Sequence, residues 1–364
     1  MNSQRIWAII GGGNGGQTMA GHLGVMGERV RLFDVVQSTV DKINETKKIN
    51  LHHAIEGVGE IEFATTDISQ ALDKADNVIV VLPTIYHDSI AEKMAPYLKD
   101  GQVILLHPES CCGAIAFRLL LERLNCRAKV VVGCVSNLLY ATRATQPGEV
   151  YVHSVKRSVN IAAIPATDNQ RLYDAVGDKF PQLKLTDHVL KISLDNTNAL
   201  MHPGPVILNA GRIEAVPHVP FEYYREGVTP SIGKVIHALD AERRAIANAL
   251  GFEQRTINEA YQGQYNYGPA DKSIDEIVSV LEDYKGIMAP TSLDTRYIHE
   301  DVPYNLVPMS ALGDIVGVDT PCTDALITLG QIFADKTKDT GRTAENMGID
   351  RMDKDTLMRY VVGE

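Results

Sequence analysis

Two clusters in the second half of the chain carry side chains suited to proton transfer and to carboxylate binding. His202 stands directly before Pro203 in an otherwise helical run. Because the residue before a proline is biased out of the α region, we expect the helix to break there and to present the imidazole at a turn. An imidazole titrates near neutrality, so it can act as a general acid or base. The alternative is an ordinary capping or core histidine, since the chain has 11 histidines.

The second cluster lies at residues 295–304 and combines a guanidinium with carboxylates. Arg296 can bind a substrate carboxylate through two parallel hydrogen bonds. One of the neighbouring carboxylates could hold an imidazole in the tautomer that proton transfer requires. The alternative for this segment is a solvated charged loop.

A glycine-rich segment near the N-terminus has the spacing of a dinucleotide-binding loop. An apolar run ends at Gly11, and Gly13 and Gly16 complete the pattern G-x-G-x-x-G. In such a loop the first glycine permits a tight turn, the second lets the backbone approach a pyrophosphate, and the third lets the helix pack closely on the strand. The first helical turn, which includes Asn14 and Gly15, would point its N–H groups at the phosphate oxygens. We therefore expect these residues to bind a dinucleotide; the alternative is a loop kept for packing alone.

Asp34 ends the second apolar run, at about the 20-residue distance at which such loops place an acidic residue. Its carboxylate can accept hydrogen bonds from both ribose hydroxyls of an adenosine. No Arg or Lys follows in residues 35–37, so a 2′-phosphate would meet repulsion without a counter-charge. The expected cofactor is therefore NAD rather than NADP.

The elements that must position these residues alternate between strands and helices in the first half of the chain. This pattern predicts a Rossmann-type, doubly wound, mostly parallel sheet with helices on both faces. Ligands bind such sheets beyond the carboxyl ends of the strands. Five segments at those ends are expected to face the cofactor: Gly11, Asp34, residues 82–84 with Pro83 and Thr84, residues 107–110, and residues 136–137.

After Ile192 the apolar residues recur at helical spacing. We therefore expect an NAD-binding domain over residues 1–187 and an all-helical, substrate-binding and catalytic domain over residues 188–364. Within the first domain, residues 52–60 are expected to form a polar loop, and residues 149–191 the last strands, one hairpin and a crossover. The expected helices of the second domain are 194–210, 230–249, 274–285, 306–316 and 323–337.

Length and composition narrow the class of protein further. A chain of 364 residues suggests two domains, and 45% hydrophobic with 22% charged residues is ordinary for a globular protein. The longest apolar stretches are far shorter than the ~20 residues that span a bilayer. A net charge of −11 argues against a nucleic-acid surface.

Location and assembly are also open to prediction from the sequence. The N-terminal residues enter the first strand at once, which leaves no room for a signal peptide, and the five cysteines are an odd number without metal-ligand spacing. We expect a cytoplasmic protein with no membrane partner and no bound metal. Apolar surface in the second half could be a homodimer face or ordinary core.

Three segments together resemble the opine dehydrogenase family, of the octopine and nopaline type, and the resemblance covers nearly the whole length. The segments are Gly-Gly-Gly-Asn-Gly-Gly after the first strand, Asn198-x-x-x-His202-Pro203, and Arg296-Tyr297-x-x-Glu300-Asp301-Val302-Pro303.

This resemblance implies an enzyme that condenses an amino acid with an α-keto acid such as pyruvate, with NAD(P)H giving hydride to the imine. It also implies roles for three residues. His202 would be the acid/base, Asp301 would orient and charge-stabilise it, and Arg296 would hold a substrate carboxylate. The active site would lie between the two domains.

Two segments depart from the family pattern, and both leave the substrate open. One runs from His107 to Cys112, where Asn-Pro-Gly is expected, and the other covers residues 134–137, where an acidic-Thr pair is expected. Glu109 could bind a cationic amino acid or cap the next helix. His107 could contact the nicotinamide ribose or pack at a strand end, and Asn137 could hydrogen-bond the cofactor or the keto acid.

Two other functions fit the same sequence. A two-domain ketone reductase related to the glycerol-3-phosphate or ketopantoate reductases would share the glycine loop and a helical domain. Those enzymes normally use a lysine as acid, and no lysine lies in the His202 or Arg296 cluster. A non-catalytic NAD-sensing protein would bind the cofactor without hydride chemistry.

Overall fold

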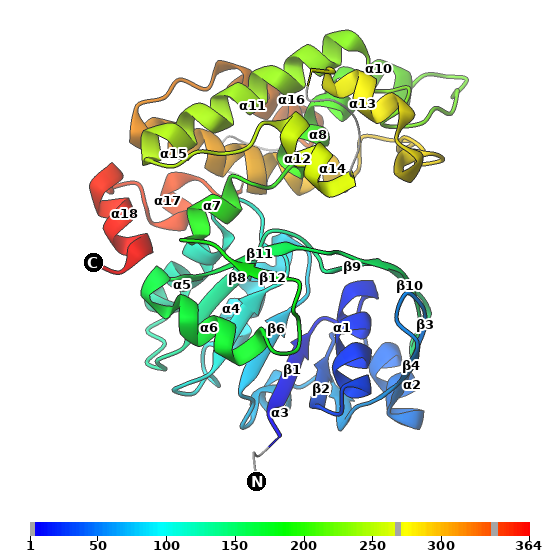
Figure 1. Cartoon of the computed structure of the whole chain (residues 1–364), viewed down its shortest axis with the longest axis vertical. Coiled ribbons are helices and arrows are strands. Elements are labelled where there is room, and N and C mark those ends of the chain that lie inside the picture. Colours follow the sequence, from blue (N-terminus) through cyan, green and yellow to red (C-terminus); the bar gives the residue numbers. More distant parts are fainter. Residues whose placement is uncertain (1–3, 266–270, 336–340) are drawn as a thin grey trace. The chain divides into compact units, whose positions relative to one another are not determined.

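The computed structural model describes residues 4–265, 271–335 and 341–364, and the chain divides into two compact units (Figure 1). Unit 1 comprises Met1–Ser193 with Arg359–Glu364, and unit 2 comprises Leu194–Met358. The expected boundary, after residue 187, precedes this division by a few residues. The C-terminal residues belong to unit 1, where the Tyr360 hydroxyl lies 3.1 Å from Oε1 of Glu122.

Unit 1 is built on an eight-stranded sheet in the order β12-β11-β8-β7-β6-β1-β2-β5. All neighbouring strands in it are parallel except β11 and β8. The predicted doubly wound sheet is therefore confirmed. The strands are β1 (Ile6–Ile10), β2 (Arg29–Phe33), β5 (Phe63–Thr65), β6 (Asn77–Val80), β7 (Val103–Leu106), β8 (Val131–Val135), β11 (Val159–Ile164) and β12 (Leu183–Leu185).

The helices of unit 1 connect these strands. At the start of α3 the side chain of Asp67 accepts a hydrogen bond from the Ser69 amide, which is a typical N-terminal cap. The helices are α1 (Asn14–Val25), α2 (Gln37–Thr46), α3 (Ile68–Leu72), α4 (His87–Met94), α5 (Gly113–Arg123), α6 (Asn169–Val176) and α7 (Val189–Ser193).

The strand register brings the carboxyl ends of five strands to one edge of the sheet. Ile10 at the end of β1 pairs with Phe33 of β2 and with Val80 of β6. Val80 pairs in turn with Leu106 of β7, and Leu106 with Cys134 of β8. The five segments that the sequence assigned to the cofactor follow these strands, so they lie along this edge.

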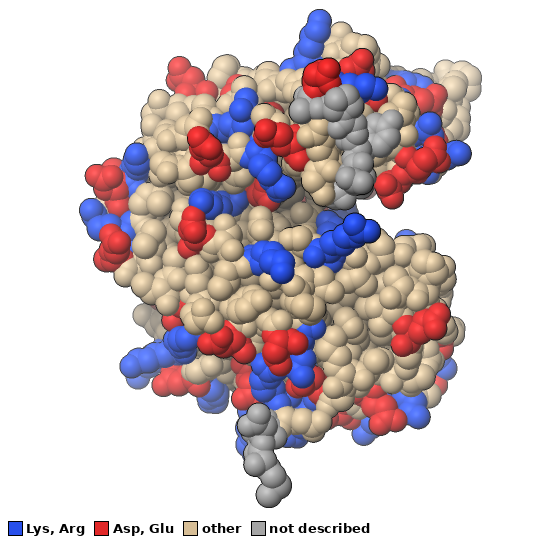
Figure 2. Space-filling model, viewed as in Figure 1, with Lys and Arg blue, Asp and Glu red and all other residues tan. Residues whose placement is uncertain are grey.

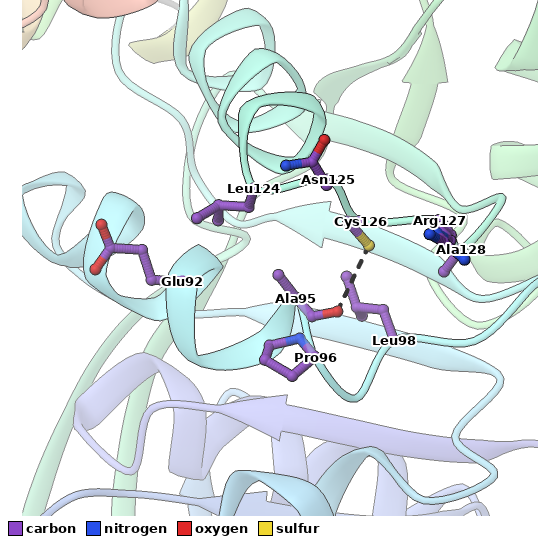
Figure 3. A pocket seen from close by; sticks show the side chains of 9 residues that line it. All are labelled: Glu92, Ala95, Pro96, Leu98, Leu124, Asn125, Cys126, Arg127 and Ala128. Carbon is purple, nitrogen blue, oxygen red and sulfur yellow. Dashed lines mark hydrogen bonds between the residues drawn. The ribbon is translucent and has the colours of Figure 1, made fainter.

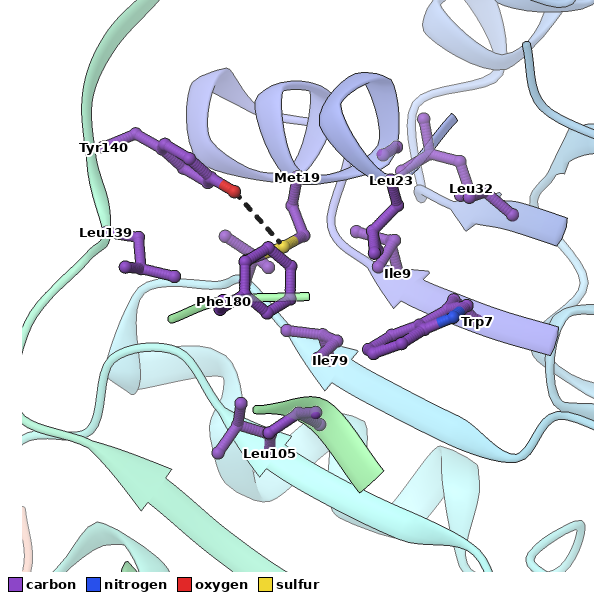
Figure 4. Packing of buried hydrophobic residues seen from close by; sticks show 14 of the residues in the cluster. Trp7, Ile9, Met19, Leu23, Leu32, Ile79, Leu105, Leu139, Tyr140 and Phe180 are labelled. Atoms are coloured by element: carbon purple, nitrogen blue, oxygen red, sulfur yellow. Dashed lines mark hydrogen bonds between the residues drawn. The ribbon is translucent and has the colours of Figure 1, made fainter. Parts of the chain in front are cut away.

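The core of unit 1 packs between the sheet and its helices (Figure 4). The rings of Trp7 and Phe180 meet edge to face with their centroids 6.2 Å apart. The polar atoms of the buried aromatic residues are satisfied. Trp7 donates its indole N–H to Glu28, and the Tyr140 hydroxyl lies 3.7 Å from Sδ of Met19.

A second sheet, with the order β4-β3-β10-β9, contradicts the polar loop expected at residues 52–60. Gly59 and Gly21 explain the error, because a Cβ at Gly59 would lie only 2.0 Å from the Gly21 carbonyl oxygen of α1. The glycine that suggested a loop instead allows a strand to pack directly on the helix. The strands are β3 (Lys48–His53), β4 (Gly57–Glu60), β9 (Tyr140–Gln146) and β10 (Glu149–Val155). β9 and β10 form an antiparallel hairpin that begins before residues 149–191, where the hairpin was expected.

Unit 2 is helical, as predicted, and its described residues pair in a β-bridge only at Glu222 and Met288. The helical run expected over 194–210 is interrupted at Pro203, as predicted, because proline lacks the N–H that would continue the helix. Three short helices replace it: α8 (Asn198–Met201), α9 (Pro203–Leu208) and α10 (Ala210–Ile213).

The remaining helices follow the predicted spacing more closely. The helix expected over 323–337 ends at Phe333, and its last two residues lie outside the described residues. The helices are α11 (Pro230–Leu250), α12 (Ile257–Tyr265), α13 (Ile274–Val280), α14 (Arg296–His299), the π-helical turn η4 (Val302–Leu306), α15 (Val307–Val316), α16 (Pro321–Phe333), α17 (Ala344–Met347) and α18 (Lys354–Val362).

The surface is charged and mixed. Figure 2 shows basic and acidic side chains interspersed over the face that it presents. Among the described residues, no helix combines the length and the apolar character that crossing a bilayer would require.

Candidate active site

His202 lies at the junction of α8 and α9. Its N–H donates to the Asn198 carbonyl, and its own carbonyl accepts from the Val206 amide and from the Tyr223 hydroxyl, at 3.2 and 2.6 Å. The predicted helix break is confirmed, but the expectation that His202 leaves the α region is wrong, since its φ and ψ are −103° and −58°. The two donors hold its carbonyl in a helical direction despite Pro203.

The imidazole of His202 is held by a buried carboxylate. Its Nδ1 lies 2.8 Å from Oδ2 of Asp301, and the two side chains are only 15% and 10% exposed. The other carboxylate oxygen of Asp301 accepts a hydrogen bond from the Asn305 amide at 2.8 Å. The carboxylate accepts a hydrogen bond from Nδ1–H, so Nε2 is the nitrogen left for proton transfer.

Tyrosines surround the other edge and one face of this imidazole. The Tyr224 hydroxyl lies 3.0 Å from Nε2 of His202, and the Tyr297 ring packs against the imidazole with centroids 4.3 Å apart. Burial raises the pKa of Tyr297 and of Tyr223. These tyrosines were not predicted as site residues. The adjacent pair Tyr223-Tyr224 in an irregular segment was the available signal.

Arg296 begins α14, directly before Tyr297. Its Nε lies 2.6 Å from Oε2 of Glu300, which is 8% exposed, whereas the arginine side chain is 75% exposed. Among the described residues, Nη1 and Nη2 of Arg296 have no hydrogen-bond partner. Glu300 therefore fixes one edge of the guanidinium, and the amino groups stay accessible to a carboxylate ligand.

The glycine loop has the geometry that dinucleotide binding requires. Gly11 has a φ of +113°, and a Cβ there would lie 2.5 Å from the Val81 carbonyl oxygen. A Cβ at Gly16 would lie 1.7 Å from the Gly11 carbonyl oxygen, so only glycine allows α1 to start so close to β1. At Gly13 a Cβ would meet no protein atom within 4 Å, which leaves its backbone open to a close ligand.

Asp34 and Asn14 flank this loop. Asp34 is half-buried, and its carboxylate accepts hydrogen bonds from the Gly12 and Val36 amides at 2.5 and 2.8 Å. These bonds turn the carboxylate toward the loop and leave it lone pairs for ribose hydroxyls. The side-chain oxygen of Asn14 accepts a hydrogen bond from the Ala144 amide of β9 at 3.0 Å. The residues at this edge thus fit an NAD cofactor.

The next strand end supplies Pro83 and Thr84. Pro83 is exposed and precedes a 3-10 turn, while Thr84 is buried, with its hydroxyl 2.8 Å from Oγ of Ser110. The Thr84 hydroxyl therefore ties the ends of β6 and β7 together, and the Pro83 ring is the part of this segment that a ligand can reach.

Glu109 caps a helix. The side chain is 2% exposed, and its two oxygens accept hydrogen bonds from the Ala114 amide at the start of α5, at 2.7 Å, and from the Ser193 hydroxyl, at 2.8 Å. A buried carboxylate at a helix N-terminus is stabilised by the helix dipole. The structure therefore favours the capping alternative over contact with a cationic amino acid.

His107 and Asn137 end neighbouring strands. His107 is 1% exposed, and burial lowers its pKa to about 4. Its Nε2 accepts the Leu139 amide at 3.4 Å, which matches the packed alternative. Asn137 is half-buried in the connection from β8 to β9, and among the described residues its side chain has no hydrogen-bond partner.

A hollow of about 430 Å³ in unit 1 lies apart from these residues (Figure 3). It is lined by Leu98, Leu124 and Cys126, among others, in the connections that precede β7 and β8. It therefore lies near the amino ends of these strands, opposite the cofactor edge. In the described part of the chain, no three His, Cys, Asp or Glu side chains are grouped to hold a metal ion.

Comparison with known proteins agrees with this geometry. The family model described as NAD/NADP octopine/nopaline dehydrogenase, alpha-helical domain, matches residues 185–334, and that of the NAD-dependent glycerol-3-phosphate dehydrogenase N-terminus matches residues 7–108. An opine dehydrogenase of Arthrobacter sp. (strain 1C) is 37% identical over 96% of both chains. Octopine dehydrogenase of Mizuhopecten yessoensis is 23% identical, over 89% of this chain and 88% of its own.

A solved structure of octopine dehydrogenase in complex with NADH and agmatine has the same fold. It superposes with a TM-score of 0.82 over 100% of this chain and 98% of that chain, at 20% identity. The fold and enzyme class expected from the sequence are thereby confirmed. The chain belongs to the opine dehydrogenase family of NAD(P)-dependent oxidoreductases.

Proposed function

We propose that the chain is an NAD-dependent opine dehydrogenase that joins the amino group of an amino acid to the carbonyl of an α-keto acid and reduces the resulting imine. One observation carries the proposal: the buried hydrogen bond of 2.8 Å between His202 and Asp301, next to an exposed arginine. This is an acid/base pair beside a carboxylate-binding group. The condensation of an amino acid with an α-keto acid needs both.

The proposed role of His202 is to move one proton during imine formation. Nε2 takes a proton from the ammonium group of the amino acid, so that the free amine can attack the keto carbon. The carbonyl oxygen takes a proton from the attacking nitrogen and becomes the hydroxyl of the carbinolamine. The imidazolium then gives its proton to this hydroxyl, which leaves as water while the C=N bond of the protonated imine forms. Asp301 stabilises the imidazolium between these two transfers.

The remaining residues would bind and orient. Arg296 would hold the keto-acid carboxylate, and the glycine loop with Asp34 would bind NAD through its pyrophosphate and its adenosine ribose. Bound NADH would supply the hydride. Structures of octopine dehydrogenase with NADH and L-arginine and with NADH and pyruvate support the substrate classes.

The test follows NADH oxidation with pyruvate in the presence and absence of pooled amino acids. Oxidation that requires both partners supports the proposal. Oxidation with pyruvate alone would favour a simple keto-acid reductase. Absence of NADH oxidation with every pair of substrates would favour an NAD-sensing protein. His202→Ala should abolish turnover while NADH binding, followed by cofactor fluorescence, stays nearly unchanged.

We further propose that the protein is cytoplasmic and forms a homodimer. Light scattering coupled to size exclusion tests the assembly, and a mass of one chain, near 39.9 kDa, would contradict it. Fractionation of the source cells tests the location.

A further inference from the structure

Both ring nitrogens of His202 have a partner within unit 2. Asp301 accepts from Nδ1, and the Tyr224 hydroxyl lies 3.0 Å from Nε2. Nε2 is the nitrogen that the proposed function assigns to proton transfer, and the inference below rests on that function. A side chain that occupies this nitrogen therefore affects each proton transfer that His202 performs.

The Tyr224 hydroxyl is held in place by packing. Tyr224 is 7% exposed, and its ring stacks on that of Tyr284 with centroids 4.1 Å apart and an interplanar angle of 20°. The Tyr223 ring meets it edge to face at 4.9 Å. The Tyr284 hydroxyl in turn lies 2.6 Å from that of Tyr261.

Among the described residues of unit 2, four titratable side chains contact His202. They are the Asp301 carboxylate, the Tyr224 hydroxyl, the Tyr297 ring and the Tyr223 hydroxyl, which bonds the His202 carbonyl. A hydrogen bond with Tyr224 also opposes the rise that burial causes in the pKa of Tyr297. The charged pair of Arg296 and Glu300 adjoins Tyr297 in the sequence.

A phenolic hydroxyl is both a donor and an acceptor. When the imidazole is neutral, the Tyr224 hydroxyl can donate a hydrogen bond to Nε2. When the imidazole is charged, Tyr224 can accept from Nε2–H and turn its own O–H toward the Tyr297 oxygen. Rotation of the hydroxyl about its C–O bond therefore lets Tyr224 satisfy Nε2 in both protonation states of the imidazole.

We propose that Tyr224 is a positioning residue that holds Nε2 of His202 in both of its protonation states. No covalent bond of Tyr224 changes in this role. Because hydrogen bonds to charged groups are stronger than those to neutral ones, loss of the hydroxyl destabilises the imidazolium more than the neutral ring.

The test is Tyr224→Phe, and the matched control is Tyr261→Phe, which removes a buried hydroxyl of the same stack that does not reach His202. The His202 signals are followed by NMR in protein with isotope-labelled histidine and are assigned by their loss in His202→Gln. In Tyr224→Phe, these signals should change at a pH lower by about half to one unit, and kcat should fall about tenfold with little change in KM. In Tyr261→Phe, the pH of the His202 titration and kcat should stay as in the parent protein.

An unchanged His202 titration in folded Tyr224→Phe, or an equal shift in both variants, would overturn the inference. If Tyr224→Phe does not fold, 3-fluorotyrosine at position 224 keeps the ring and a hydroxyl that stays protonated through the imidazole titration. Its hydroxyl is a stronger donor and a weaker acceptor, so the titration should again move to lower pH. The titration requires no turnover. Absence of dehydrogenase activity in the parent protein would therefore contradict the proposed function and leave this measurement interpretable.

Discussion

His202 and Asp301 share a buried hydrogen bond of 2.8 Å between Nδ1 and Oδ2. His202 is placed by a break between two short helices, and Asp301 by the start of the π-helical turn η4. Asn305, one turn further along, donates to the second oxygen of Asp301. The carboxylate is thus fixed from two sides, and the imidazole takes its orientation from a rigid partner.

Replacement of this carboxylate should impair the chemical step selectively. In Asp301→Asn, the amide has no charge to stabilise the imidazolium and can donate to Nδ1, which would favour the wrong tautomer. We expect kcat to fall about 10²- to 10⁴-fold. Steady-state kinetics with both substrates measure this, with the exposed Asp319→Asn as a control. Loss of NADH binding in Asp301→Asn would point to a structural role instead.

Substitution of Arg296 should affect binding more than turnover. Arg296→Lys keeps the charge but loses the planar fork that binds a carboxylate through two bonds. We expect KM for the keto acid to rise about tenfold with a smaller change in kcat. The control is Arg351→Lys, whose side chain is 95% exposed. A KM equal to that of the parent would show that another group binds the carboxylate.

The same added methyl group should greatly lower the stability of the protein at one glycine of the cofactor loop and change it little at another. Gly16→Ala places a Cβ 1.7 Å from a backbone oxygen, so we expect a loss of stability of about 3 kcal/mol or more. Gly13→Ala meets no protein atom, so stability should change by about 1 kcal/mol or less. Thermal unfolding measures both effects.

The same Gly13→Ala variant tests the cofactor assignment. If a pyrophosphate packs against this backbone, the methyl group should raise the Kd for NADH by about tenfold or more. Isothermal titration with NADH gives the value. Binding as tight as in the parent, in a stably folded Gly13→Ala variant, would place the pyrophosphate elsewhere.

The cofactor edge could be predicted because its signals are local. A glycine loop that follows an apolar run lies at the carboxyl end of a strand in a doubly wound sheet, and so do polar residues that follow buried parallel strands. The His202, Asp301 and Arg296 set was a different case. From spacing alone, His202 could be a core residue and residues 295–304 could be a solvated loop. Only the resemblance to the family motif placed the two segments in one site.

The features that could not be predicted depend on contacts between distant segments. Gly59 suggests a loop until α1 is packed against it, and Glu109 is equally suited to a ligand or to a helix cap until its burial is known. Tyr224 reaches His202 only because an irregular segment folds back over α9. None of these contacts leaves a periodic signal in the sequence.

His107 should make the protein less stable in mild acid. Burial, opposed by a backbone hydrogen bond and aided by the charge of Lys156, lowers its folded pKa from 6.5 to about 4. Between these values the unfolded chain binds a proton that the folded protein does not, so the free energy of unfolding falls as the pH falls from 6.5 toward 4. Over this range the loss should approach about 3 kcal/mol. Urea unfolding at several pH values measures it. In His107→Asn, the free energy of unfolding should depend less steeply on pH than in the parent protein. The exposed His153→Asn should show the same dependence as the parent. Equal slopes in all three proteins would contradict the prediction.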